Sequence, residues 1–274
     1  MKTKPTSRKG AKLHKKNRSP CLSFLVRLSA FAGGRFRLHG ALTIAFLLAC
    51  GTALADDKPT ARTERQVEGW TVRVDRRLLA GPGAPLGAKS LRFLEAKLSD
   101  IVAVVPADRL AKLRGVVIAL DLTHGDLKSI QYHPSAEWLT GHGYAADLAK
   151  CVHIPRAADL PVRRNVNEQP WVMLHELAHA YHDQVLGFDD ARVDAAYTNY
   201  KASGRGDATL LYDGRKVRHY ALTNRMEFFA EMTEAYFGVN DFATFNRAEL
   251  KRDEPDIEEL LKHIWESPAA KPGR

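Results

Sequence analysis

Cysteine is scarce in this chain, which limits the ways in which the protein can be stabilised. The 274 residues contain three cysteines, Cys21, Cys50 and Cys151. If the protein is cleaved after Ala55, as predicted below, Cys151 alone remains. A single cysteine cannot form an internal disulfide, so the remaining protein must be held together by its hydrophobic core.

Acidic residues are absent from the first 38 positions, which carry eleven lysines and arginines. An apolar run at 40–50 follows, and it is too short to span a bilayer stably. The A-x-A sequence at 53–55 then predicts cleavage after Ala55. We therefore predict that residues 1–55 are a signal peptide with a long basic leader and that the protein is exported to the periplasm or the extracellular space. The alternative is lipidation at Cys50, because residues 47–50 resemble a bacterial lipoprotein box; this anchor is the only membrane contact that we expect.

The excess of positive charge is confined to the leader. The whole chain has 41 Lys/Arg and 32 Asp/Glu, a net charge of +9. Without the eleven bases of the leader, 30 bases face 32 acids, a net charge of −2. The charge therefore gives no support for a nucleic-acid partner.

The mature part of the chain mixes the two kinds of hydrophobic periodicity. Apolar residues predict strands at 70–75, 116–120 and 151–154, a hairpin at 208–220, and helices at 90–105, 171–182, 189–202, 223–236 and 254–265. This mixture predicts an α+β fold with one domain at 69–268. We expect a flexible tether at 56–68 and a polar tail at 269–274.

An H-E-x-x-H sequence lies on one of the predicted helices. His175 and His179 are four residues apart, so they lie on one helical face and can reach the same metal ion. Glu176 is turned roughly 100° from His175, where it can take a proton from a water molecule on the metal. Pro170 suits the first turn of this helix, and Gly187 is a plausible stop.

A catalytic zinc ion normally has a third protein ligand. The best candidate is Glu227, which shares a stripe with Glu231 and Glu234 at i, i+4 and i+7. We expect Glu231 to accept the free ring N–H of a zinc-binding histidine. The alternative is that Asn224-x-x-Glu227 is a capping box and that the acidic stripe is a solvated face.

Other histidines are weaker candidates. His182 lies about 10.5 Å along the helix axis from His175, too far to share its ion, so we expect a supporting or surface position. His124, His133, His142 and His153 stand among glycines and prolines and are expected to be solvated loop residues. In many zinc peptidases a strand shortly before the metal-binding helix runs beside the cleft and pairs with an extended peptide, so by this likeness we expect the strand at 151–154 there.

The two motifs together resemble the gluzincin zinc peptidases. The Glu-Phe-Phe-Ala-Glu form of the second motif, with Tyr220 seven residues before Glu227, most resembles the anthrax lethal factor-like protease domain family over residues 168–240. That resemblance implies a zincin-like metallopeptidase domain, with a small mixed sheet packed on the H-E-x-x-H helix and a second ligand-bearing helix. It implies that His175, His179 and Glu227 bind one Zn²⁺ per chain.

The same resemblance implies that Glu176 is the general base and that Tyr220 stabilises the oxyanion; the alternative for Tyr220 is a packed hairpin tyrosine. We expect an exported, monomeric zinc metalloendopeptidase that acts on a peptide or protein. Two alternatives remain open. One is a non-catalytic envelope binding protein with a structural or vestigial metal site, and the other is zinc-dependent action on a non-peptide substrate.

Overall fold

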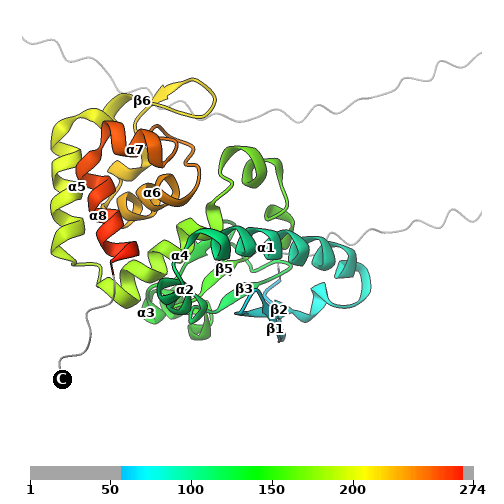
Figure 1. The fold of residues 1–274 in the computed structure, drawn as a ribbon. Helices are drawn as coiled ribbons and strands as arrows, with labels where there is room; N and C mark the ends of the chain where they lie inside the picture. Colours follow the sequence, from blue (N-terminus) through cyan, green and yellow to red (C-terminus); the bar gives the residue numbers. More distant parts are fainter. Residues whose placement is uncertain (1–56, 268–274) are drawn as a thin grey trace, which may run out of the picture. The chain divides into compact units, whose positions relative to one another are not determined.

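The computed structural model describes residues 57–267 (Figure 1). The predicted signal peptide, the lipidation site at Cys50 and the tail at 269–274 lie outside the described residues. Among the helices of the described part, none is both long and apolar enough to cross a membrane.

A five-stranded mixed sheet forms one side of the fold, and its strand order is β1-β2-β3-β5-β4. The central strands β2, β3 and β5 are parallel, whereas β1 and β4 run antiparallel to their neighbours at the two edges. A separate two-stranded ribbon pairs β6 with β7. The strands span Arg62–Val67 (β1), Trp70–Asp75 (β2), Ile118–Leu120 (β3), Gln131–Tyr132 (β4), Val152–Ile154 (β5), Thr209–Leu210 (β6) and Lys216–Val217 (β7).

Eight α-helices complete the described part, and the prediction of an α+β fold is confirmed. The predicted helices at 90–105, 189–202 and 254–265 are present as α1, α5 and α8, whereas α2 and α7 were not predicted. The helices span Ala84–Val104 (α1), Ala107–Arg114 (α2), Ala136–Gly141 (α3), Val172–Tyr181 (α4), Ala191–Ser203 (α5), Arg225–Phe237 (α6), Arg247–Asp253 (α7) and Pro255–Glu266 (α8).

The prediction of a flexible tether at 56–68 is wrong for its second half. Residues 62–67 form β1, which pairs with β2 along its whole length. Glu68 and Gly69 both have positive φ, at 51° and 89°, as a two-residue hairpin turn of the primed type requires. Because β1 is an edge strand with a solvated face, its sequence is polar and shows no apolar alternation.

Helix α4 lies between the sheet and the helices of the C-terminal half (Figure 1). It packs against α1, β4 and β5 on one side and against α6 on the other. On the α6 side, the ring of Trp265 lies 4.4 Å from Tyr181 and 5.9 Å from Phe229, between ring centroids. These buried aromatic contacts hold α4, α6 and α8 together, so the two motif-bearing helices are fixed against each other.

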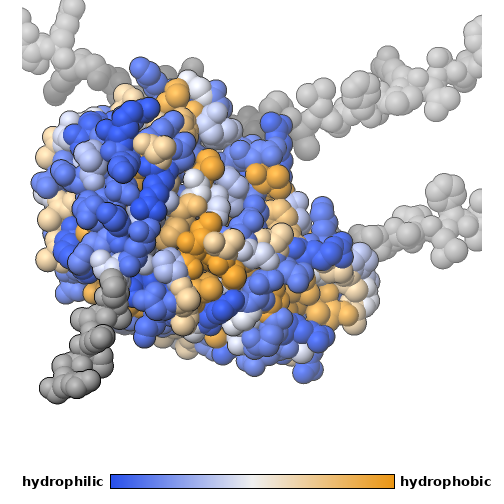
Figure 2. Space-filling model, viewed as in Figure 1, coloured by the Kyte–Doolittle hydropathy of each residue, from blue (hydrophilic) through white to orange (hydrophobic). Residues whose placement is uncertain are grey.

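The outer helices show the expected division between solvent and core. In α8, Ile257, Leu261, Ile264 and Trp265 are buried. The surface over α5 and α8 is mostly hydrophilic, whereas hydrophobic residues gather in the middle of the view, between these helices and the sheet (Figure 2). This pattern is typical of helices that cover a core with one face.

Three of the four histidines predicted to be solvated are buried. His124, His133 and His153 are at most 3% exposed, and only His142 is exposed as expected. The prediction fails because these residues belong to the sheet or directly extend it. His153 is in β5, and Asp121, which follows β3, donates its main-chain N–H to the Ile154 carbonyl. His133 follows β4 and donates its main-chain N–H to the Cys151 carbonyl. Strand residues near the middle of a sheet are buried whatever glycines and prolines surround them in sequence.

These histidines form a hydrogen-bonded network around Asp121. The Oδ2 atom of Asp121 accepts from His124 Nδ1 and His153 Nε2, both at 2.8 Å, while Arg62 donates to both carboxylate oxygens at 2.8 Å. Burial alone would raise the pKa of Asp121, but these bonds hold it well below its usual range. Asp121, His124 and His153 lie close enough together to hold a metal ion. The bidentate Arg62, however, supplies the positive charge there, so we interpret the network as structural.

Candidate metal centre and its cleft

The H-E-x-x-H helix has the boundaries that its flanking residues predict. Helix α4 begins at Val172, two residues after Pro170, and ends at Tyr181. One wider turn, His182–Leu186, follows before Gly187, whose φ is 83°. Such a conformation suits glycine because it has no Cβ, and it ends the helical run.

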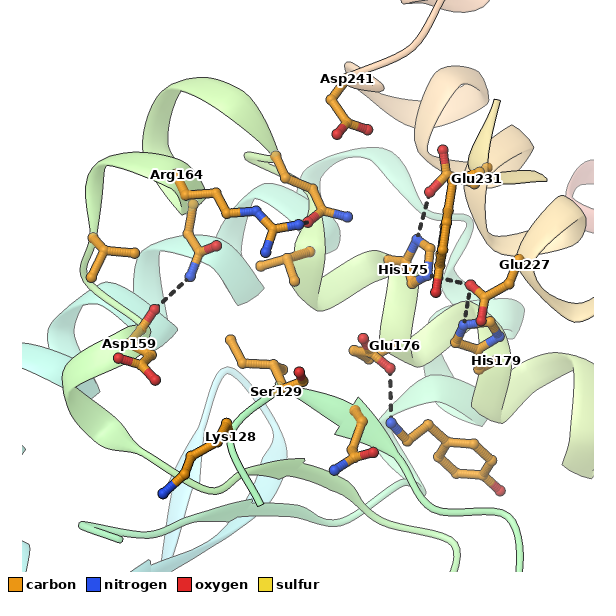
Figure 3. Close-up of a pocket in the computed structure, with 18 of the residues that line it drawn as sticks. Lys128, Ser129, Asp159, Arg164, His175, Glu176, His179, Glu227, Glu231 and Asp241 are labelled. Atoms are coloured by element: carbon orange, nitrogen blue, oxygen red, sulfur yellow. Dashed lines mark hydrogen bonds and ion pairs between the residues drawn. The ribbon is translucent and has the colours of Figure 1, made fainter. Parts of the chain in front are cut away.

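The side chains of His175, His179 and Glu227 converge on one point. The Nε2 atoms of His175 and His179 lie 3.1 Å and 3.3 Å from the same oxygen, Oε2 of Glu227. Figure 3 shows the two rings reaching from α4 and the carboxylate from α6 toward each other. The structure therefore brings together the three residues that were predicted as ligands, and they form one of the groups that could hold a metal ion.

Asn224 does cap the helix that carries Glu227. Its Oδ1 accepts from the N–H groups of Met226 and Glu227, at 2.8 Å and 2.9 Å. The Glu227 carboxylate, however, bonds to the two histidines, and Glu231 and Glu234 are at most 1% exposed. The alternative of a solvated acidic face is therefore wrong, whereas the cap is real and coexists with the histidine contacts.

The protonation of this group supports a cation at its centre. The Nδ1 of His175 lies 2.6 Å from Oε1 of Glu234, and because a carboxylate only accepts, Nδ1 carries the proton. The Nε2 of the neutral ring then turns a lone pair toward a negatively charged oxygen of Glu227. This contact is favourable only if a second proton or a metal ion lies between them, and two imidazole nitrogens with one carboxylate oxygen are a donor set that zinc prefers.

The pKa shifts of these groups correspond to the second proton, which His175 would carry when no metal ion is bound. Burial lowers the pKa of His175, but its hydrogen bonds with Glu227 and Glu234 raise the pKa well above the usual value. For Glu227, burial raises the pKa. The hydrogen bonds from His175 and His179 outweigh this effect of burial and bring the pKa of Glu227 to about 2. The site therefore favours an ionised carboxylate facing positive charge.

Glu234, and not Glu231, holds the other nitrogen of His175. Glu231 Oε1 lies 3.6 Å from Nδ1, beyond a good hydrogen bond, and its Oε2 accepts from Asn240 Nδ2 at 3.0 Å. The assignment of Glu231 to this bond is therefore wrong in the structure. Burial and the neighbouring Glu234 raise the pKa of Glu231 well above its usual value, which favours its neutral form.

Replacing Glu234 with alanine is expected to weaken zinc binding roughly 10- to 100-fold, because a carboxylate that orients a ligand histidine contributes about this much. Glu231→Ala is the matched control: it removes a buried glutamate one turn earlier that carries little charge. We expect it to change the dissociation constant for zinc much less. Competition with a chromophoric chelator measures both constants, and an equal or larger loss in Glu231→Ala would reverse our assignment.

Glu176 points from α4 toward β4 (Figure 3). Its Oε2 accepts the main-chain N–H of Tyr132 at 2.8 Å, and the residue is 8% exposed. Burial raises the pKa of Glu176, while His175 and His179 oppose this rise. A carboxylate of raised pKa beside the candidate metal position is suited to exchange protons.

Tyr220 lines the same cavity. The predicted hairpin strand ends at Val217, and Tyr220 begins a short 3₁₀ turn, Tyr220–Leu222, with 47% of its surface exposed. His219 Nδ1 accepts the Ala221 N–H at 3.1 Å and caps this turn. The interpretation of Tyr220 as a packed hairpin tyrosine is therefore wrong, and its side chain is available to a ligand in the cavity.

His182 occupies neither of the positions expected for it. It is fully buried, and its ring lies 5.3 Å from Phe188 and 5.0 Å from Phe229. Neither ring nitrogen has a hydrogen-bond partner within the described residues. Burial lowers the pKa of His182 to about 4, so it acts as a neutral core residue.

A cavity of about 790 Å³ leads to the converging side chains. One wall is β4 with the residues just before it, and another is the segment from Asp159 to Gln169. The prediction that the strand at 151–154 borders the cleft is wrong, because β5 is internal and β4 covers its edge. The short edge strand β4 is therefore the one beside the cleft.

Comparison of the chain with protein-family models, with curated proteins and with solved structures finds no match.

Proposed function

We propose that this chain is a zinc-dependent metallopeptidase with a zincin-like catalytic domain. The convergence of two histidine Nε2 atoms and one carboxylate oxygen, at 3.1 Å and 3.3 Å, is the observation that carries the proposal. Glu176 beside this group supports catalysis over simple metal binding, since a structural metal site has no need of a further buried carboxylate that opens into a large cavity.

His175, His179 and Glu227 would hold the metal ion, and Glu234 would orient His175. Three protein ligands leave a position open, as in catalytic zinc sites. When bound, zinc supplies Lewis-acid polarisation of the scissile carbonyl and lowers the pKa of water toward about 7. The predicted signal peptide supports action outside the cytoplasm, and we expect the protein to work as a monomer.

The chain's own groups account for the proton transfers of amide hydrolysis. Because Oε2 of Glu176 is held by the Tyr132 N–H, Oε1 is the atom that accepts a proton from the attacking water. The same carboxyl group then delivers this proton to the nitrogen of the leaving amine. Tyr220 directs its hydroxyl at the charge that develops on the carbonyl oxygen.

The substrate that fits best is a peptide in extended conformation. The cavity runs along the edge strand β4, and extended peptides bind to strand edges through main-chain hydrogen bonds. The polar residues of the cavity wall, among them Gln131 and Gln169, can bond to the remaining peptide groups.

Elemental analysis and a peptide library test the proposal together. We expect one zinc per chain, cleavage of library peptides by the zinc-loaded protein, loss of cleavage in a strong chelator and recovery when zinc is returned. Protein that neither contains nor takes up zinc would contradict the proposal and favour the envelope binding protein. Zinc binding without cleavage of any peptide would favour a structural metal or a non-peptide substrate.

A further inference from the structure

Tyr132 contacts the helix α4 region at two places from the edge strand β4. Its main-chain N–H donates to Oε2 of Glu176 at 2.8 Å. Its hydroxyl donates to Oδ2 of Asp183 at 2.6 Å, in the turn that directly follows α4. One residue therefore joins the candidate general base to the end of the helix that carries it.

Further side chains bond to the Tyr132 hydroxyl and to Asp183. Gln184 Nε2 donates to the Tyr132 hydroxyl at 3.0 Å, and Lys150 Nζ pairs with the same Asp183 oxygen at 2.5 Å. Tyr132 is 7% exposed, and burial together with Asp183 raises its pKa, so the hydroxyl stays protonated. A buried phenol bonded to an ionised carboxylate is a strong contact of the charge-assisted kind.

Strand β4 packs against α4, and within residues 57–267 its hydrogen bonds to the α4 region all involve Tyr132. β4 consists of two residues, Gln131 and Tyr132, and its ladder partner is β5 alone. The bond from the Tyr132 N–H is the one hydrogen bond that the Glu176 carboxylate makes within residues 57–267. A small displacement of β4 would therefore free Glu176 to rotate, and a misplacement of about 1 Å in a reacting group can reduce a rate about 100-fold.

We propose that Tyr132 is a positioning residue: its hydroxyl, bonded to Asp183, fixes β4 against α4 so that its main-chain N–H holds the Glu176 carboxylate in the orientation for proton transfer. This inference rests on the proposed function for its effect on catalysis. The hydrogen bond from β4 to Glu176, in contrast, can be tested whether or not the protein cleaves peptides.

Tyr132→Phe tests the effect on catalysis, because it removes the hydroxyl and keeps the ring. We expect kcat to fall about tenfold, with KM within about threefold and with zinc content unchanged. Asp183→Ala is expected to give the same fall. The double variant should be no worse than either single variant, since both changes break one connection.

Tyr236→Phe is the matched control. The Tyr236 hydroxyl donates to Oε1 of Glu266 at 2.7 Å and lines no part of the cavity, so the control loses an equivalent bond elsewhere. An unchanged kcat in Tyr132→Phe would overturn the inference. So would a fall that appears only in KM, one that accompanies zinc loss, or one that the control reproduces.

Hydrogen exchange of the residue 132 amide, followed by NMR, provides the readout that is independent of activity. In the wild type this amide should be protected by Glu176, and Glu176→Ala should speed its exchange at least tenfold while its β5 neighbours stay protected. Tyr132→Phe should speed it as well. If the amide exchanges at the same rate in all three proteins, the connection does not exist and the inference is wrong, whatever the wild type cleaves.

Discussion

Glutamine in place of Glu176 is expected to abolish turnover almost completely while zinc stays bound. The substitution keeps the size of the side chain and an oxygen that can accept the Tyr132 N–H, but it removes the group that we propose takes and returns a proton. General acid–base groups contribute about 10²- to 10⁴-fold, and in the proposed mechanism one carboxylate serves both proton transfers. We therefore expect kcat to fall at least about 1000-fold, measured on a library-derived peptide.

The zinc content of Glu176→Gln and a control variant at an exposed glutamate are needed to interpret this result. Among residues 57–267, the hydrogen bond of the Glu176 carboxylate goes to the Tyr132 N–H and none goes to His175, His179 or Glu227, so one zinc per chain should remain. Glu95→Gln, at an exposed position of α1, removes the same charge and should leave kcat unchanged. If Glu176→Gln keeps more than about a tenth of the wild-type kcat, Glu176 is not the general base.

Alanine in place of Glu227 is expected to cause the largest loss of zinc binding. This residue supplies the one carboxylate oxygen on which both histidine nitrogens converge. Removing a carboxylate that only orients a ligand costs about 10- to 100-fold in metal affinity, so removing a ligand should cost more, about 1000-fold or above. The zinc dissociation constant, measured by chelator competition, provides the test.

A separate control variant tests the capping of α6 by Asn224. Asn224→Ala removes the cap of α6 but none of the candidate ligands. We expect it to lower the free energy of unfolding by about 1 kcal/mol and to leave zinc stoichiometry unchanged. If Glu227→Ala behaves like Asn224→Ala and retains zinc, Glu227 acts as a capping-box residue and another side chain is the third ligand.

Much of the candidate site follows from local sequence because helical spacing is a local property. His175 and His179 lie on one face at i and i+4, and the capped start of α6 places Glu227 on its first turn. The boundaries of α4 likewise follow from Pro170 and Gly187, whose backbone preferences act over one or two residues. What local spacing determines is which side chains share a face.

The choice between Glu231 and Glu234 is one that helical spacing cannot predict. Relative to Glu227, these two residues are turned by about 40° and about 20° in opposite directions on the helix, so the sequence makes both available. The way in which α4 crosses α6 selects Glu234, at 2.6 Å from His175 Nδ1, and leaves Glu231 at 3.6 Å. That crossing depends on the packing of Trp265 with Tyr181 and Phe229, which are far apart in the chain.

Contacts from the sheet are equally beyond local patterns. Tyr132 lies 44 residues before Glu176, and its N–H reaches the carboxylate because β4 pairs with β5 beside α4. His153 is buried by the same sheet, although from the sequence we expected it to be solvated. The sequence by itself determined the two motif-bearing helices, their shared faces and the residues able to bind a metal ion. Only the tertiary structure decided their partners, because those depend on which elements pack together.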